Sequence, residues 1–146
     1  MVSSEPYTRF KIDVRKAFVE RSNITGRIVA ILDLKLSERE LHLITPHSRA
    51  LRKNEIHEII ITTDANAFPG AVVKGATYIG FFEVIEGGVA LVGDEIMIKG
   101  EKICTIRGFD ETHMPNHLNV VCYAKEAKTG KELGIHINDD VIISSQ

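Results

Sequence analysis

The chain has 146 residues, and its 18 basic and 20 acidic side chains give a net charge of −2 at pH 7. This length suits one domain that buries a core without disulfides or a structural metal. The balanced charge argues against a nucleic-acid-binding surface or a polybasic membrane patch. No apolar run approaches the ~20 residues that span a bilayer, and the N-terminus lacks the pattern of a secretory signal. We therefore expect a cytoplasmic protein with no nucleic-acid or membrane partner.

Two cysteines, Cys104 and Cys122, each lie inside an apolar segment. We interpret them as small buried hydrophobic residues in a reducing compartment rather than as a disulfide. Residues 1–6 are expected to form a flexible tail, and residues 7–146 a single domain. No low-complexity segment or internal repeat divides the chain.

The N-terminal third predicts three strands and one helix. Tyr7–Arg15 alternates apolar and charged residues, which is typical of a half-buried strand. Arg27–Leu36 predicts a more apolar strand, joined through Ser37–Arg39 to a partner at Glu40–Thr45. Thr45 followed by Pro46 matches a helix N-cap and first helical position, so a short helix is expected to end near Lys53.

The rest of the chain predicts short strands separated by turn-forming residues. Asp64–Gly75 is expected to be an irregular loop. Such a pattern favours an all-β, mainly antiparallel fold, in which closure protects the strand edges. We expect one small closed or partly open β-barrel of about 8–10 short strands with one or two short helices. The strands are expected at 56–63, 77–85, 88–92, 95–99, 102–107, 118–125, 132–137 and 141–144.

The main candidate site is the segment between the apolar strands 102–107 and 118–125. A loop between two core strands emerges at one barrel mouth, where small-molecule sites are common. Histidine and carboxylate side chains there suit acid/base chemistry near neutral pH. A solvated polar loop and a metal site through the H-x3-H spacing are the alternatives, although Pro115 opposes the continuous helix that this spacing requires. The candidate catalytic residues are Arg107, Asp110, Glu111, His113 and His117.

Other residues are candidates for ligand binding. His47, Ser48 and Arg49 open the predicted helix, whose N-terminus attracts anions, although ordinary capping explains the same pattern. His136 alternates with isoleucines and is either a surface residue or part of a pocket. His42 and His57 also lie in predicted strands, and we interpret both as surface residues. Phe68 lies in the long loop and adds aromatic surface to a pocket or a subunit contact.

The sequence lacks the common nucleotide-binding, serine-hydrolase and zinc-protease signatures. The segment Gly93–Gly100 (GDEIMIKG), followed by Ile103–Ile106, resembles part of the glucitol/sorbitol-specific IIA component of the sugar phosphotransferase system. That resemblance covers residues 93–106 and implies a small β-barrel. No functional residue is carried over, because Ala65–Thr112 contains no histidine to match the phosphorylated histidine of that family.

Together these features predict a barrel that binds a small polar or anionic molecule at one mouth. It is expected to act as an acid/base enzyme of the lyase, isomerase or cyclase type. The alternative is a non-catalytic interaction module that pairs through exposed strand edges, with a homodimer as one such assembly. The sequence does not identify a cofactor.

Overall fold

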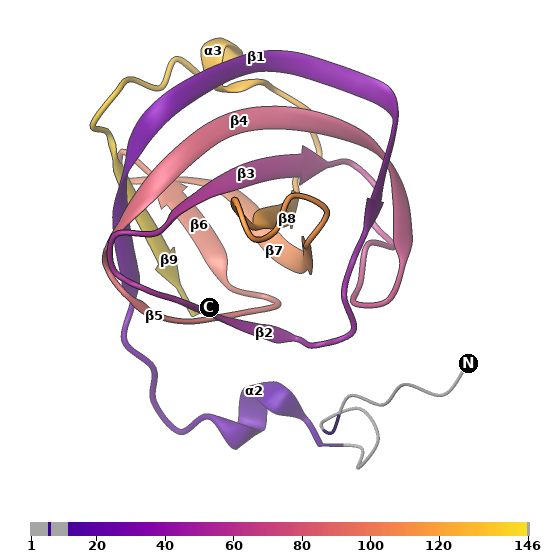
Figure 1. Cartoon of the computed structure of the whole chain (residues 1–146), viewed down its shortest axis with the longest axis vertical. Helices are drawn as coiled ribbons and strands as arrows, with labels where there is room; N and C mark the ends of the chain where they lie inside the picture. The colour runs from indigo at the N-terminus through magenta and orange to yellow at the C-terminus, as the bar shows by residue number, and fades with distance from the viewer. Residues whose placement is uncertain (1–5, 7–11, 146) are drawn as a thin grey trace.

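The computed structural model describes Pro6 and residues 12–145. Seven strands close into a ring, the closed β-barrel of Figure 1, in the order β1-β4-β3-β8-β7-β6-β9. Every pair is antiparallel except β3–β8, which is parallel. The expected all-β, mainly antiparallel fold is therefore confirmed. The described elements are α2 (Val14–Ala17), β1 (Ile24–His42), β2 (Ser48–Leu51), β3 (Ile56–Thr62), β4 (Val72–Glu86), β5 (Gly88–Leu91), β6 (Glu95–Ile98), β7 (Glu101–Asp110), β8 (Asn119–Tyr123), α3 (Gly130–Leu133) and β9 (Asp140–Ser144).

The two strands expected between Arg27 and Thr45 are in fact one strand of 19 residues, β1. The polar stretch Ser37–Arg39 stays extended because β1 pairs with β4 from Thr25 to His42. Four register shifts interrupt this pairing, and bulges of this kind let a long strand bend. β1 and β4 consequently form nested arcs around the ring (Figure 1).

The prediction of a helix from Pro46 to Lys53 is also wrong. Ser48–Leu51 instead forms β2, which pairs with Gly88–Leu91 outside the ring. The Thr-Pro cap signal is local, and a partner strand some 40 residues away overrides it. His47, Ser48 and Arg49 therefore do not lie at a helix N-terminus.

Two further expectations about the ends of the chain are corrected. The strand expected at 132–137 is replaced by α3, which begins with a capping box between Thr129 and Glu132. Residues 7–11 of the expected first strand lie outside the described residues, as does the expected tail except for Pro6. Val14 and Arg15 belong to α2, whose N-cap is Asp13.

The interior of the ring is filled by alternate side chains of its strands. Ile59 and Ile61 of β3 point inward, and fully buried side chains of β4, β6 and β7 meet them. Both cysteines lie in this interior cluster and are free, and burial raises the pKa of the Cys122 thiol. The interior is a packed apolar core that includes Ile79, Phe82, Ile96 and Phe109.

A second, smaller core covers part of the outer face of the ring. The end of β1 contributes Leu41 and Leu43, and these residues pack over Ile60 of β3 and Val121 of β8. Ala67 in the loop between β3 and β4 joins the same cluster. This outer core keeps water from a strip of β3 and β8 that faces away from the barrel interior.

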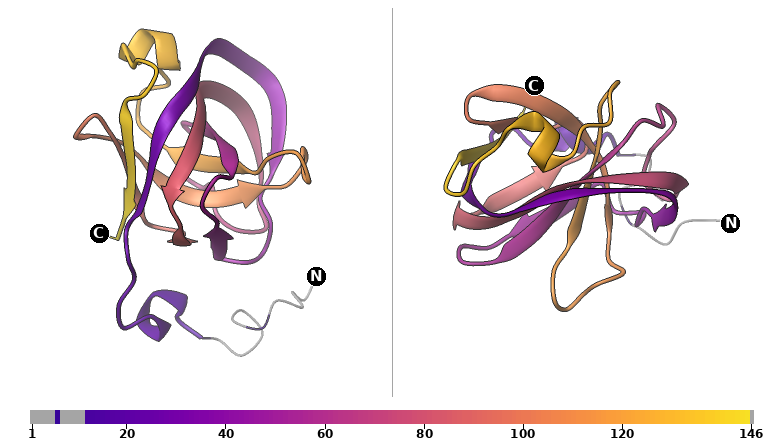
Figure 2. Two further views of the ribbon diagram at one scale, coloured as in Figure 1. Left: turned by 60° about the vertical axis from the view of Figure 1, so that its left-hand side comes forward. Right: turned by 90° about the horizontal axis from the view of Figure 1, so that it is seen from above.

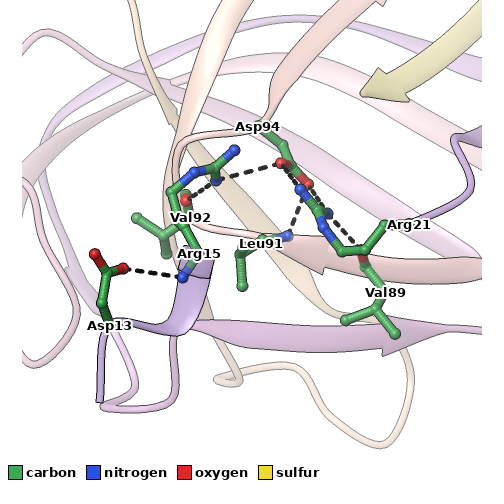
Figure 3. Close-up of polar contacts among 7 residues, drawn as sticks. All are labelled: Asp13, Arg15, Arg21, Val89, Leu91, Val92 and Asp94. Carbon is green, nitrogen blue, oxygen red and sulfur yellow. Dashed lines mark hydrogen bonds and ion pairs between the residues drawn. The ribbon is translucent and has the colours of Figure 1, made fainter. Parts of the chain in front are cut away.

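The N-terminal arm is attached to the body at the turn between β5 and β6, through the buried carboxylate of Asp94 and the backbone carbonyls of Val89 and Val92 (Figure 3). Arg21 donates two hydrogen bonds to Asp94, at 2.7 and 2.8 Å, and Arg15 lies 3.4 Å from the same group. The Leu91 backbone N–H also donates to Asp94. These contacts hold α2 against the outside of the ring (Figure 1). No helix among the described residues is long and apolar enough to span a membrane.

Candidate functional site

A row of side chains crosses the outer face of four neighbouring strands. Glu58 on β3 lies opposite Phe81 on β4 and beside Asn119 on β8, and Asn119 lies opposite Asp110 on β7. Residues in register on adjacent strands share a face, so these four side chains lie side by side. Glu58, Asn119 and Asp110 are buried. The row thus brings polar groups into contact with the dry outer core.

Asp110 is held by hydrogen-bond donors on both oxygens. The backbone N–H groups of His42 and Thr112 donate to it at 2.8 and 2.9 Å, and the Asn119 amide donates at 3.2 Å. Burial favours the neutral acid, but these donors outweigh it, and the pKa of Asp110 lies below its ordinary value. Asp110 therefore fixes the end of β1 to the start of the 111–118 loop, and its oxygens are occupied.

Glu58 and His117 form the central pair of the site. The His117 Nε2 lies 3.3 Å from Glu58 Oε1, and the side-chain amide of Asn116 donates to His117 Nδ1 at 2.9 Å. With Nδ1 accepting, the ring proton is on Nε2 and points to Glu58. The side chains are 6% and 11% exposed for Glu58 and His117 respectively. The Phe81 ring packs edge-on against the His117 ring, with the two ring centroids 5.0 Å apart.

The surroundings raise the pKa of one partner and lower that of the other. Burial raises the pKa of Glu58 from 4.5 to about 7, while the charges of His113 and Arg39 act in the opposite direction. Burial also lowers the pKa of His117 below 6.5, although the side chain of Asn119 acts to raise it. Between pH 6.5 and about 7, a neutral carboxylic acid therefore lies next to a neutral imidazole. Among the described residues, only His117 hydrogen-bonds the Glu58 carboxyl, which leaves Oε2 free.

Two more histidines adjoin this pair. The exposed His113 ring stacks on His117 with centroids 5.0 Å apart. His57 is buried, and its Nδ1 accepts a hydrogen bond from the Leu118 backbone N–H at 3.0 Å. Burial lowers the pKa of His57, and its Nε2 faces Glu55 at 3.2 Å. We infer that His57 anchors the end of the 111–118 loop, whereas His113 covers the central pair.

The structure also brings Arg49 to the loop. Arg49 lies 3.4 Å from Glu111 and donates to the Met114 sulfur at 3.8 Å. Of the expected catalytic residues, His113, His117 and Glu111 therefore gather with Arg49 around one loop, which projects from the ring between β7 and β8 (Figure 2). Arg107 points elsewhere, since its guanidinium lies over the Tyr123 ring, 4.9 Å from the centroid.

The remaining candidate ligand-binding residues contact other parts of the chain. His47 and Phe68 meet edge-on at 5.2 Å, and Ser48 begins β2 opposite Leu91. His136 is exposed in the segment between α3 and β9, close to Lys99 and Asp139. His136 therefore makes no contact with the Glu58–His117 pair.

A shallow groove of about 600 Å³ lies at the end of β1. Arg39 lines this groove, and its charge acts on Glu58. Thr112 also lines it and directly precedes His113. The groove thus lies where the end of β1 meets the loop, and its other lining residues are Glu38, Glu40, His42 and Lys74.

Sequence patterns do not single out Glu58, and the expectation that His57 is a surface residue is wrong. One signal is present, because His57 and Glu58 interrupt an otherwise apolar run from Ile56 to Ile61. A charged residue within a core strand needs a partner when buried. Within residues 12–145, no three His, Cys, Asp or Glu side chains are grouped closely enough to hold a metal ion.

Comparison with known families gives one match, to the family described as "Family of unknown function (DUF6917)", over residues 18–144. The chain belongs to this family. The DUF6917 match begins just after α2 and includes every strand of the ring. Searches of curated proteins and of solved structures found no significant match. The resemblance of residues 93–106 to a phosphotransferase component stays a prediction, because the DUF6917 description states no function.

Proposed function

We propose that this DUF6917 protein is an acid/base enzyme of the lyase, isomerase or cyclase type, in which Glu58, supported by His117, transfers protons to and from a small polar or anionic substrate. The observation that carries this proposal is the Glu58 carboxyl, buried beside a neutral imidazole with a pKa raised to about 7. A group whose pKa lies near the working pH is both present in the required form and able to move a proton.

Within the pair, Glu58 is the group that gains and loses the proton, and His117 supports it. Below pH about 7, Glu58 carries a proton on a carboxyl whose Oε2 makes no other hydrogen bond among the described residues. A carboxylic acid kept neutral in this way serves as a proton donor, and after ionisation it serves as a base. His117, held by Asn116 at Nδ1, supports either state of Glu58 through its Nε2–H.

Other residues of the site suit substrate binding. The groove at the end of β1 is lined by Arg39, Lys74 and Thr112, whose polar groups suit a carboxylate or hydroxyl substituent on the substrate. His113 is the exposed member of the histidine stack, so it meets solvent and an entering molecule first. The two free, buried cysteines support the expected cytoplasmic location.

The test measures proton exchange directly, so the natural substrate need not be identified first. Small carbon acids, with pyruvate, dihydroxyacetone and malonate as the first members of the panel, are incubated with the protein in D2O, and loss of C–H signal is followed by proton NMR. The wild-type protein is expected to accelerate exchange of at least one compound. Glu58→Gln and His117→Gln are each expected to reduce that acceleration by about 10²–10⁴-fold.

The matched control is Glu126→Gln, which neutralises a carboxylate that is 78% exposed and lies beyond the end of β8. It should exchange protons at the wild-type rate. Full exchange activity in Glu58→Gln would remove the proposed role of the pair. Absence of exchange across the panel, together with unchanged NMR signals of His113 and His117, would argue against a small-molecule site here.

A further inference from the structure

Within the described residues, one edge of β1 lacks a partner strand over much of its length. β1 pairs with β4 along one edge, but β9 covers the other edge only at residues 24–27, extended by hydrogen bonds between Ile28 and the 138–139 turn. From Val29 to Glu40, no backbone hydrogen bond to that second edge occurs within the described part of the chain. Residues 33–38 are all exposed. An open strand edge of this length is a template for pairing with another strand.

The sequence along this edge is nearly palindromic. Residues 32–36 read Leu-Asp-Leu-Lys-Leu, with Leu34 at the centre. Alternation places the three leucines on one face, beside Tyr78 of the outer core, and the two charges on the other. Leu34 and Leu36 are 42% and 40% exposed.

A palindrome of this kind is self-complementary in an antiparallel pair. If Leu34 lies opposite Leu34 of a second copy, then Asp33 lies opposite Lys35 of that copy, and Lys35 opposite its Asp33. Both cross-strand pairs are then attractive. Moving the two-fold axis by one residue along the strand places Asp33 opposite Asp33 or Lys35 opposite Lys35, and like charges directly opposite are destabilising. Charge therefore selects both the partner and the register.

We propose that β1 residues 30–38 pair antiparallel with the same residues of a second copy, centred on Leu34, to form a two-fold dimer. The pairing joins two barrels edge to edge and brings the exposed leucines of both copies together on one face. A groove of about 390 Å³ along Lys35–Arg39 lies beside Leu36, where Leu32 of the second copy arrives. The pairing segment contains neither Glu58 nor His117, and it shares Glu38 with the larger groove at the end of β1.

Helix α3 contacts the charged side chains of this segment and leaves residues 33–38 exposed. Thr129 Oγ1 donates to Asp33 at 2.9 Å, and Lys35 lies 3.1 Å from Glu132. A Cβ on Gly130 would lie 2.0 Å from the Ile79 carbonyl oxygen, so α3 lies against the flat face of β1 and β4. Figure 1 shows α3 beside the top of the β1 arc. Asp33 and Lys35 stay about half exposed and can meet a second copy.

The test exchanges charges on the full-length protein and measures its mass by analytical ultracentrifugation over a wide micromolar range. The wild type is expected to show a concentration-dependent monomer–dimer equilibrium. Asp33→Lys places lysines opposite one another, and Lys35→Asp places aspartates opposite one another, so each variant is expected to dimerise about thirtyfold more weakly. The double variant D33K/K35D restores opposite charges and should dimerise as the wild type does.

Mixing the two single variants gives the sharpest result. One copy then carries two lysines and the other two aspartates, so a heterodimer should form from proteins that are monomeric alone. The control is Lys102→Glu, which reverses a similar cross-strand charge beside Glu95 within the ring and should not affect dimerisation. Thermal unfolding confirms that each variant is folded. A monomeric wild type at every concentration, or a dimer that the charge exchanges leave unchanged, would overturn the proposal.

Discussion

Replacing Glu58 with glutamine should stabilise the protein, and more so as pH rises. The folded carboxyl has a pKa of about 7, against 4.5 for an ordinary glutamate. Because the folded pKa is the higher one, the wild type is most stable when the carboxyl is protonated in both states. Wild-type stability then falls as pH rises from 4.5 towards 7, since only the unfolded chain ionises freely in that window.

The size of the effect follows from the difference between the two pKa values. Each pKa unit between the folded and unfolded states corresponds to about 1.4 kcal/mol. The rise from 4.5 to about 7 therefore costs the wild type about 3 kcal/mol of unfolding free energy above neutral pH. Glutamine keeps an oxygen that accepts from His117 and has no proton to lose, so Glu58→Gln escapes this cost.

Urea unfolding followed by far-UV circular dichroism measures the effect, since the chain contains no tryptophan. The unfolding free energies of the two proteins should be similar near pH 4.5 and differ by about 3 kcal/mol in favour of Glu58→Gln by pH 8. Groups that titrate alike in both proteins cancel in the difference. A difference that is flat with pH, or a variant that is less stable at pH 8, would refute the raised pKa.

Three further predictions test the framework around the site. Asp94→Asn leaves Arg21 without its buried charged partner and should lower the free energy of urea unfolding by about 3–5 kcal/mol. As a control, Glu95→Gln breaks a half-exposed ion pair with Lys102 and should lower it by under about 1 kcal/mol. Asp110→Asn should lower the unfolding free energy by about 2 kcal/mol at neutral pH. Because the pKa of Asp110 is lowered in the folded protein, this loss should disappear as pH falls below 3.8 through the folded pKa. A loss of stability that persists in acid would contradict the prediction. Gly130→Ala places a Cβ within 2.0 Å of the Ile79 carbonyl oxygen and should lower the melting temperature sharply. Gly134→Ala has open space around a residue in the left-handed conformation, so it should lower the unfolding free energy by only about 1 kcal/mol. Equal melting temperatures for the two variants would show that α3 is not packed as described.

The fold class was predictable because most strands carry their own signal. The apolar run at Ile59–Ile61 and the glycine turns at 87–88, 93 and 100 locate strands without reference to the rest of the chain. Errors arose where distant partners decide the local structure. Ser48–Leu51 becomes a strand because Gly88–Leu91 pairs with it, and Ser37–Arg39 stays extended because β4 continues beside it.

One of the wrong predictions could have been avoided from the sequence alone. Thr129-Gly-Lys-Glu132 has the spacing of a helix capping box, but the alternation from Glu132 to Ile137 suggested a strand. The short helix prevails because Thr129 and Glu132 satisfy each other's backbone and Gly134 ends the helix in a left-handed conformation.

The site was only half predictable. The loop between two apolar strands pointed to His113 and His117, but the partner of His117 lies 59 residues earlier, on β3. Glu58 points away from the barrel interior, where a sequence pattern places solvent. Leu41 and Leu43 exclude water from this strip, and only the three-dimensional course of β1 brings them there.

The proposed chemistry depends on Glu58 holding a proton close to neutral pH. Carbon-13 NMR of protein labelled at the glutamate carboxyl carbons, titrated from pH 3 to 9, measures that proton directly, and the Glu58→Gln spectrum assigns the signal. One glutamate should titrate near pH 7. A Glu58 signal that titrates near 4.5, like an ordinary exposed glutamate, would contradict it.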